Sequence, residues 1–180
     1  MFRARGKYLL FADADGATKF SDYEKLEELL LTICEGTEDI SEALGIVCGS
    51  RAHMEKESIV SRSLFRTILM KGFHMVVYIF AVKNVKDTQC GFKILTRRTA
   101  RLVFNSLHVE RWAFDVEMLF IAQSLDIPID EVPVNWTEIE GSKVTPIVSW
   151  VQMGIDIFMI WLKYTTGSWR VRGDMLRAEN

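Results

Sequence analysis

The chain has 180 residues, of which 49% are hydrophobic and 26% charged, and only 3 are proline. This composition excludes collagen-like, low-complexity and disordered classes, and it predicts about one packed domain. Lys and Arg total 22 against 24 Asp and Glu, so no strong positive field would gather nucleic acid, and we expect no nucleic-acid partner. The three cysteines lack the close pairing typical of zinc sites.

The first third of the chain alternates apolar runs with helical patterns. Residues 7–12 are an apolar run that predicts a buried strand, and 21–34 carry the spacing of an amphipathic helix. Residues 44–48 predict a second buried strand. From 57 to 82 runs a long helical pattern that is basic early and apolar late.

The remainder repeats this alternation. After a polar loop at 86–93 and a short strand, Thr96 is placed to cap a helix that runs to about Leu107. Three further elements follow: a helix over about 113–125, a strand over 129–136 and a last helix over 146–164. The order predicts an α/β sandwich with a mainly parallel sheet, in which ligand groups lie beyond the carboxyl ends of the strands.

Two aspartates follow the first predicted strand. Asp13 and Asp15 leave the strand at i and i+2, and their hard carboxylate oxygens suit a divalent cation that also takes phosphate oxygens. Asp-Ala-Asp-Gly is also good turn chemistry. A third reading is the Asp-x-Asp-Gly-Thr motif of haloacid-dehalogenase-like phosphatases, but here Ala17 precedes Thr18.

Two other loops carry groups suited to anions. Arg51 follows Gly49 and Ser50 and can offer a planar, permanently charged fork to a phosphate, although a surface arginine is the plainer interpretation. Ser142 and Lys143 follow a glycine in a second loop that can form an anion pocket or a simple turn.

Two further features leave alternatives open. Asp115 lies near the start of a predicted helix, where it either caps the helix or reaches a cleft to position an acceptor or take a proton. The apolar stretches 73–82 and 146–164 are either core helices or amphipathic helices in a membrane interface.

Five motifs stand in order: Asp13-Ala-Asp-Gly-Ala-Thr-Lys19, Gly49-Ser-Arg-Ala-His53, Asp87-Thr-Gln-Cys-Gly-Phe-Lys93, His108-Val-Glu-Arg-Trp-Ala-Phe-Asp-Val-Glu117 and Asn135-Trp-Thr-Glu-Ile-Glu-Gly-Ser-Lys143. In this order the chain resembles the dolichyl-phosphate beta-glucosyltransferases, a specific group within glycosyltransferase family 2. The resemblance implies a GT-A-like (Rossmann-like) fold and an inverting enzyme at the cytosolic face of the endoplasmic reticulum membrane. It would transfer glucose from UDP-glucose to dolichyl phosphate, for N-glycan precursor assembly.

The resemblance also implies roles for single residues. Asp13 and Asp15 would hold Mg²⁺ or Mn²⁺ on the diphosphate of the donor. Phosphates of donor or acceptor would contact Arg51, Ser142 and Lys143, whereas Asp87, Gln89 and Asp115 would line the sugar and acceptor side. Because a phosphate monoester is largely ionised at neutral pH, Asp115 would position the acceptor rather than act as a strong base.

Members of this group begin with a membrane anchor and the strands of a uridine pocket, whereas this chain starts just before the Asp13 strand. We therefore expect residues 1–145 to be the C-terminal part of a GT-A domain, incomplete at its N-terminal side, and 146–180 an amphipathic helix with a basic tail. Two alternatives to the glucosyltransferase stay open. One is a catalytically incompetent membrane-associated fragment, and the other is a dolichyl-phosphate mannosyltransferase that uses GDP-mannose.

Overall fold

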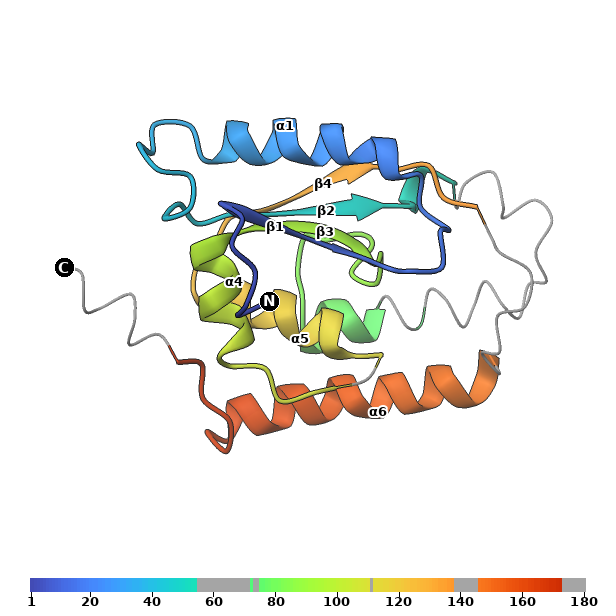
Figure 1. Ribbon diagram of the computed structural model, residues 1–180. Coiled ribbons are helices and arrows are strands. Elements are labelled where there is room, and N and C mark those ends of the chain that lie inside the picture. The colour runs from blue at the N-terminus through green and yellow to red at the C-terminus, as the bar shows by residue number, and fades with distance from the viewer. Residues whose placement is uncertain (55–71, 73–74, 111, 138–145, 173–180) are drawn as a thin grey trace.

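The computed structural model describes residues 1–54, 72, 75–110, 112–137 and 146–172. Figure 1 shows a sheet with helices on both faces, so the predicted α/β class is confirmed. Helix α1 (Tyr23–Ile33) covers one face of the sheet. Helices α4 (Arg97–Phe104) and α5 (Phe114–Ser124) cover the other face, and α6 (Pro146–Thr165) packs outside α5.

The sheet has four strands in the order β1-β3-β2-β4. They are β1 (Tyr8–Ala12), β2 (Ile46–Ser50), β3 (Phe92–Thr96) and β4 (Ile129–Pro133). β3 runs antiparallel to both β1 and β2, and only β2 and β4 pair in parallel. The sheet is therefore mixed, and the prediction of a mainly parallel sheet is wrong. The reason is that the chain after β2 returns to the edge where β2 ended before β3 begins, as the contact between Arg51 and Asp87 indicates.

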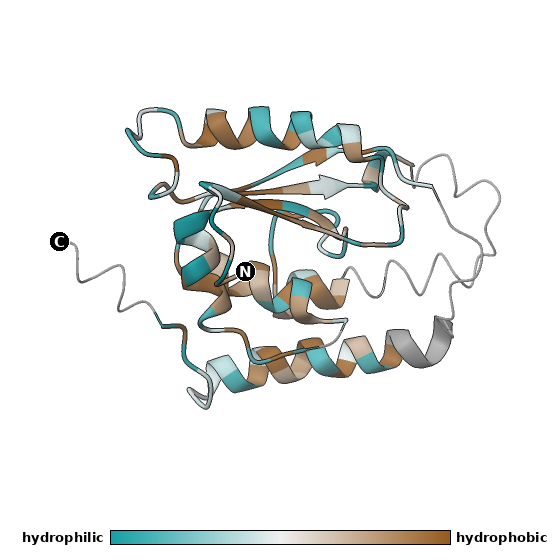
Figure 2. Ribbon diagram, in the orientation of Figure 1, coloured by the Kyte–Doolittle hydropathy of each residue, from teal (hydrophilic) through white to brown (hydrophobic). Residues whose placement is uncertain are grey.

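Alternation along the strands divides the core between the two faces. Val47 and Ile94 pack with the buried leucines of α1, Leu26 and Leu30. The opposite face of β2 and β3 packs on α4, α5 and α6. Each fully buried leucine contributes roughly 1.5–3 kcal/mol relative to an exposed one, so α1 is fixed mainly by this stripe. Figure 2 shows that hydrophobic and hydrophilic residues are both present along α1.

Thr96 joins β3 directly to α4 and confirms the predicted cap. Its hydroxyl oxygen accepts a hydrogen bond from the Thr99 backbone N–H at 3.3 Å, and its O–H donates to the Ala43 carbonyl at 2.7 Å. The helix ends at Phe104, before the predicted Leu107. β4 ends at Pro133, three residues before the predicted end at 136, and the missing N–H of proline limits further pairing there.

The remaining boundaries agree closely with the sequence patterns. The predicted helices over 21–34, 113–125 and 146–164 correspond to α1, α5 and α6. Of the long helix predicted over 57–82, a helix at 75–80 is described, whereas 57–71 and 73–74 lie outside the described residues. None of the helices in the described part of the chain combines the length and apolarity needed to cross a bilayer.

Candidate functional site

Polar side chains gather at one edge of the sheet. β1 and β2 point in the same direction and end at this edge, while the antiparallel β3 begins there. The turn after β1, the turn after β2 and the loop before β3 therefore meet, although they are distant in sequence. The antiparallel direction of β3 keeps the predicted site residues together, because it brings the loop before β3, residues 86–91, to the same edge.

Asp13 and Asp15 lie at the carboxyl end of β1. The Asp13 N–H donates to the Gly91 carbonyl at 2.8 Å, and the Asp13 carboxylate lies so close to Gly91 Cα that a Cβ there would overlap it. Asp15 Oδ1 accepts from the Ala17 N–H at 2.9 Å, as in an Asx turn. Burial raises the pKa of Asp13 and the charge of Asp15 raises it further, while Lys93 and Arg51 act in the opposite direction.

Arg51, at the end of β2, makes a bidentate ion pair with Asp87. Its Nε donates to Asp87 Oδ2 at 2.7 Å and its Nη2 to Oδ1 at 2.8 Å, while the Arg51 backbone N–H also donates to Oδ2 at 2.9 Å. The guanidinium carbon lies 5.4 Å from the ring centroid of Trp136, a cation–π geometry. Burial raises the pKa of Asp87, but the hydrogen bonds and charge of Arg51 outweigh it, so the net direction is downward.

The Asp87 loop is held in turn by Glu131 of β4. Its Oε1 accepts from the Asp87 N–H and its Oε2 from the Lys86 N–H, each at 2.9 Å. One carboxylate thereby satisfies two backbone donors and ties the loop to the parallel neighbour of β2. Glu131 of β4 therefore holds the Asp87 loop, and Asp87 in turn orients the Arg51 guanidinium.

Lys93 and Asp115 form a second ion pair, deeper at the same edge. Lys93, on the central strand β3, is fully buried, and its Nζ donates to Asp115 Oδ1 at 2.7 Å and to the Cys90 carbonyl at 2.5 Å. Burial raises the pKa of Asp115, and the charges of Asp13 and Asp87 add to this rise against the opposing effect of Lys93. Burial opposes the charged form of Lys93, but the charge of Asp115 raises its pKa overall.

This edge can be tested for its fit to a divalent cation. Six of the charged side chains at this edge carry a formal sum of −2, from four carboxylates and two cations: Asp13, Asp15, Asp87, Asp115, Arg51 and Lys93. Within the described residues, no group of three or more His, Cys, Asp or Glu side chains could hold a metal alone. Two carboxylates nonetheless suit Mg²⁺, which is commonly bound by one or two protein carboxylates with substrate phosphates and water. The donors fit a cation that arrives with a phosphorylated ligand.

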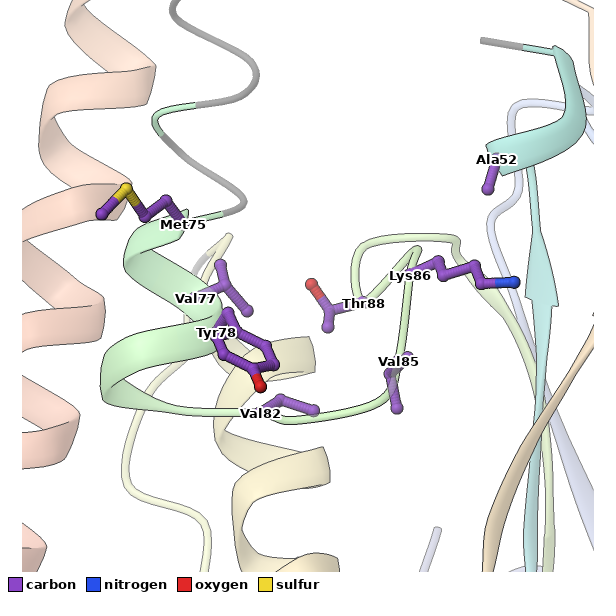
Figure 3. A pocket seen from close by; sticks show the side chains of 8 residues that line it. All are labelled: Ala52, Met75, Val77, Tyr78, Val82, Val85, Lys86 and Thr88. Atoms are coloured by element: carbon purple, nitrogen blue, oxygen red, sulfur yellow. The ribbon is translucent and has the colours of Figure 1, made fainter. Parts of the chain in front are cut away.

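A pocket of about 480 Å³ opens beside the Asp87 loop (Figure 3). It lies between the helix at 75–80 and the loop at 82–88, next to the turn after β2. Most of its lining is apolar, with one ammonium and two hydroxyls: Ala52, Met75, Val77, Tyr78, Val82, Val85, Lys86 and Thr88. It therefore suits an apolar chain that joins a polar head near Asp87.

The chain is 60% identical to a dolichyl-phosphate beta-glucosyltransferase of Drosophila melanogaster over 171 residues, which are 95% of this chain and 51% of that protein. It is 59% identical over 175 residues to the protein of that name from Mus musculus, and 58% identical over 174 residues to the one from Homo sapiens, covering 52% of each. The chain is homologous to the dolichyl-phosphate beta-glucosyltransferases. It spans about half the length of these relatives, and no family model matches it.

The structure brings together most of the residues that the resemblance to dolichyl-phosphate beta-glucosyltransferases singles out. Arg51 and Asp87, to which separate ligand roles were assigned, bind each other. Gln89 lies at the same edge, with its side-chain amide 3.3 Å from the Met153 sulfur of α6. The predicted Ser142 and Lys143 lie outside the described residues.

Sequence reasoning missed the roles of Lys93 and Glu131. A signal for Lys93 was available, since a single lysine within the apolar run 92–95 predicts a buried cation, and a buried cation requires a carboxylate partner. No comparable signal marks Glu131, which follows another acidic residue, Asp130.

Proposed function

We propose that this chain belongs to the catalytic part of an enzyme that transfers glucose from UDP-glucose to dolichyl phosphate, giving dolichyl beta-D-glucosyl phosphate for N-glycan precursor assembly. The observation that carries the proposal is the 58–60% identity to dolichyl-phosphate beta-glucosyltransferases over about 95% of the chain. In this proposal residues 1–145 are part of a GT-A-like domain, and 146–180 form an amphipathic helix and basic tail.

The donor side of the reaction falls to Asp13 and Asp15. Their carboxylates would hold Mg²⁺ or Mn²⁺ against the diphosphate of UDP-glucose. When bound, the metal would neutralise the charge that develops on the departing UDP. The formal charge of −2 on the six side chains Asp13, Asp15, Asp87, Asp115, Arg51 and Lys93 supports this assignment, because an anionic diphosphate would be repelled without a cation.

The acceptor side falls to Asp115, Asp87 and the residues they hold. The phosphate oxygen of dolichyl phosphate would form a bond to the anomeric carbon as the bond from that carbon to the diphosphate breaks, which inverts the configuration. A phosphate monoester has its second pKa near 6 and is largely ionised at neutral pH, so no strong base is needed. Asp115 would position the reacting groups, and Arg51, Gln89, Ser142 and Lys143 would contact the phosphates and the sugar.

We propose further that α6 and the helix at 75–80 lie in the cytosolic interface of the endoplasmic reticulum membrane. Phe80 packs at 5.8 Å from Phe158 and at 5.3 Å from Trp161, measured between ring centroids, so the two helices lie side by side. Both helices expose large apolar side chains: Met75, Tyr78, Ile79, Val151, Ile155, Phe158 and Met159. Apolar side chains gathered on adjacent helices favour insertion into the headgroup boundary, and the neighbouring apolar pocket would receive the first isoprenoid units.

The transfer itself is tested with radiolabelled UDP-glucose, dolichyl phosphate and Mn²⁺ in detergent. We expect label in the organic phase that depends on the metal, and competition by unlabelled UDP-glucose but not by GDP-mannose. Competition by GDP-mannose and not by UDP-glucose would indicate that the donor is GDP-mannose. No transfer by this chain and none by a longer protein containing it would refute the proposal.

The membrane proposal is tested by flotation with vesicles that contain anionic lipid. Ile155→Glu together with Val151→Glu should reduce the bound fraction, because each charge must enter an apolar layer. Leu31→Glu is the matched control, since Leu31 is 49% exposed on α1 on the other side of the sheet. Equal flotation of all variants would contradict the proposal.

A further inference from the structure

Lys93 is the most deeply buried charge at the sheet edge. Its exposure is 0%, and it is the second residue of β3, opposite Phe11 of β1 and Cys48 of β2. An ammonium in such a place costs free energy unless it is paired and hydrogen-bonded. Its position therefore requires the specific partners that the structure provides.

The two partners of Lys93 come from different parts of the fold. Asp115 lies in the first turn of α5, and the Cys90 carbonyl lies in the loop before β3. Asp115 is 22 positions from Lys93, whereas Cys90 is only three residues before it, in the loop that leads into β3. One ammonium consequently fixes the first turn of α5 relative to the loop at 86–91.

The loop that Lys93 holds also supports Asp13. Gly91 follows Cys90 directly, accepts the Asp13 N–H at 2.8 Å and lies against the Asp13 carboxylate. A displacement of the Cys90 carbonyl would therefore move the surface on which that carboxylate rests. Through these contacts Lys93 links Asp115 to Asp13.

We propose that Lys93 is a positioning residue, which fixes the spacing between the carboxylate of Asp115 and the metal-binding carboxylate of Asp13. The inference rests on the proposed function, because it concerns the same edge. It adds a residue to which no role had been assigned. A purely structural ion pair would stabilise the fold without controlling this spacing, and the two roles differ in measurable ways.

The first experiment measures the geometry directly, without activity. Mn²⁺ is added together with UDP to the ¹⁵N-labelled full chain, and the paramagnetic broadening of the amides of Cys90 and Asp115 is compared with that of Asp13. In the unmodified chain we expect all three to broaden. In Lys93→Met the broadening of Cys90 and Asp115 should change relative to Asp13, because the tether is lost.

Glu117→Gln is the matched control, since Glu117 is a fully buried carboxylate two residues further along α5 with no contact to Lys93. It should leave the broadening pattern unchanged. Where Lys93→Met fails to fold, the double variant Lys93→Met with Asp115→Asn removes both charges and carries the test through the Cys90 amide. An unchanged pattern in the lysine variants, or no broadening of Asp115 in the unmodified chain, would overturn the proposal.

The second experiment uses glucosyl transfer. Lys93→Met should lower kcat by roughly 100-fold, because small misplacements of reacting groups have effects of that size, with KM for UDP-glucose within about threefold. Glu117→Gln, compared at equal folded fraction, should retain kcat. Equal kcat in the two variants would refute the role of Lys93 while leaving the proposed function intact. If the unmodified chain transfers no glucose, the proposed function fails for this chain and the Mn²⁺ experiment alone decides on Lys93.

Discussion

Asp115 and Glu117 lie two residues apart at the start of α5, and both are buried, yet their surroundings differ in kind. Glu117 Oε2 accepts hydrogen bonds from the backbone N–H groups of His108 at 3.0 Å and Val109 at 2.7 Å. Its Oε1 accepts from the Tyr164 hydroxyl at 2.9 Å. Its oxygens are thus matched by donors that belong to the fold and join α5 to α6.

Asp115 instead faces an ammonium and two further carboxylates. Lys93 binds its Oδ1, while the charges of Asp13 and Asp87 add to the effect of burial and raise its pKa. Glu117 therefore has the environment of a structural carboxylate, since its oxygens are bound by backbone N–H groups, by the Tyr164 hydroxyl and by the His108 ring, whose Nδ1 lies 3.2 Å from Oε1. Asp115 belongs to a group with excess negative charge, which a bound cation would relieve.

The largest effect is expected at the two aspartates after β1. Replacing Asp13 and Asp15 together by asparagine should lower glucosyl transfer by more than about 100-fold, because both proposed anionic metal ligands are lost. The free energy of unfolding should change little, since Asp15 is exposed and Asp13 is only partly covered, by Gly91. Transfer assays and urea titrations measure the two effects. Retained transfer at saturating Mn²⁺ would argue against a metal at this edge.

Glu117→Gln should show the opposite pattern. The amide offers N–H groups to donors that require an acceptor, so the free energy of unfolding should fall by about 2 kcal/mol. Transfer per folded molecule should stay within about threefold of the unmodified chain. Urea unfolding followed by circular dichroism gives the stability. A large loss of transfer by fully folded protein would show that Glu117 acts in catalysis, and it would contradict the purely structural role assigned to Glu117.

Gly91→Ala tests the position of the Asp13 carboxylate by adding a single methyl group beside it. The added Cβ overlaps the Asp13 carboxylate, so the side chain must move while the backbone remains. We expect transfer to fall by roughly tenfold, with a weaker response to Mn²⁺. Gly154→Ala is the matched control, because an added Cβ there meets nothing within 4 Å. Equal kinetics in both variants would contradict the close approach of Asp13 to Gly91.

The smallest expected effect is on the free energy of unfolding when Asp22 is replaced, and this effect depends on pH. Burial raises the pKa of Asp22, but the bonds from Lys25 and Asn135 outweigh it and the net direction is below 3.8. The stabilisation is therefore present above pH 3.8 and is lost as the pH falls through the folded pKa. Asp22→Asn should lower the free energy of unfolding by about 1 kcal/mol at pH 7. A difference from the unmodified chain that does not become smaller as the pH falls below 3.8 would contradict this assignment.

The sequence predicted the elements better than their directions. The apolar stripe of α6 and the hydroxyl cap of Thr96 are local features, and both appear where they were predicted. The direction of β3 depends on how residues 51–91 connect two strands, and no local pattern reports that path. The pairings of Arg51 with Asp87 and of Lys93 with Asp115 likewise join residues that are 36 and 22 positions apart. Sequence spacing indicated which residue types gather at the edge, but not which of them neutralise one another.

The central claim is that the carboxylates after β1 hold a divalent cation at this edge of the sheet. Anomalous X-ray diffraction from crystals grown with Mn²⁺ and UDP tests it most directly. We expect a manganese peak within coordination distance of Asp13 and Asp15, on the side of Asp115. A manganese peak elsewhere, with these two carboxylates bound only to protein groups, would contradict it.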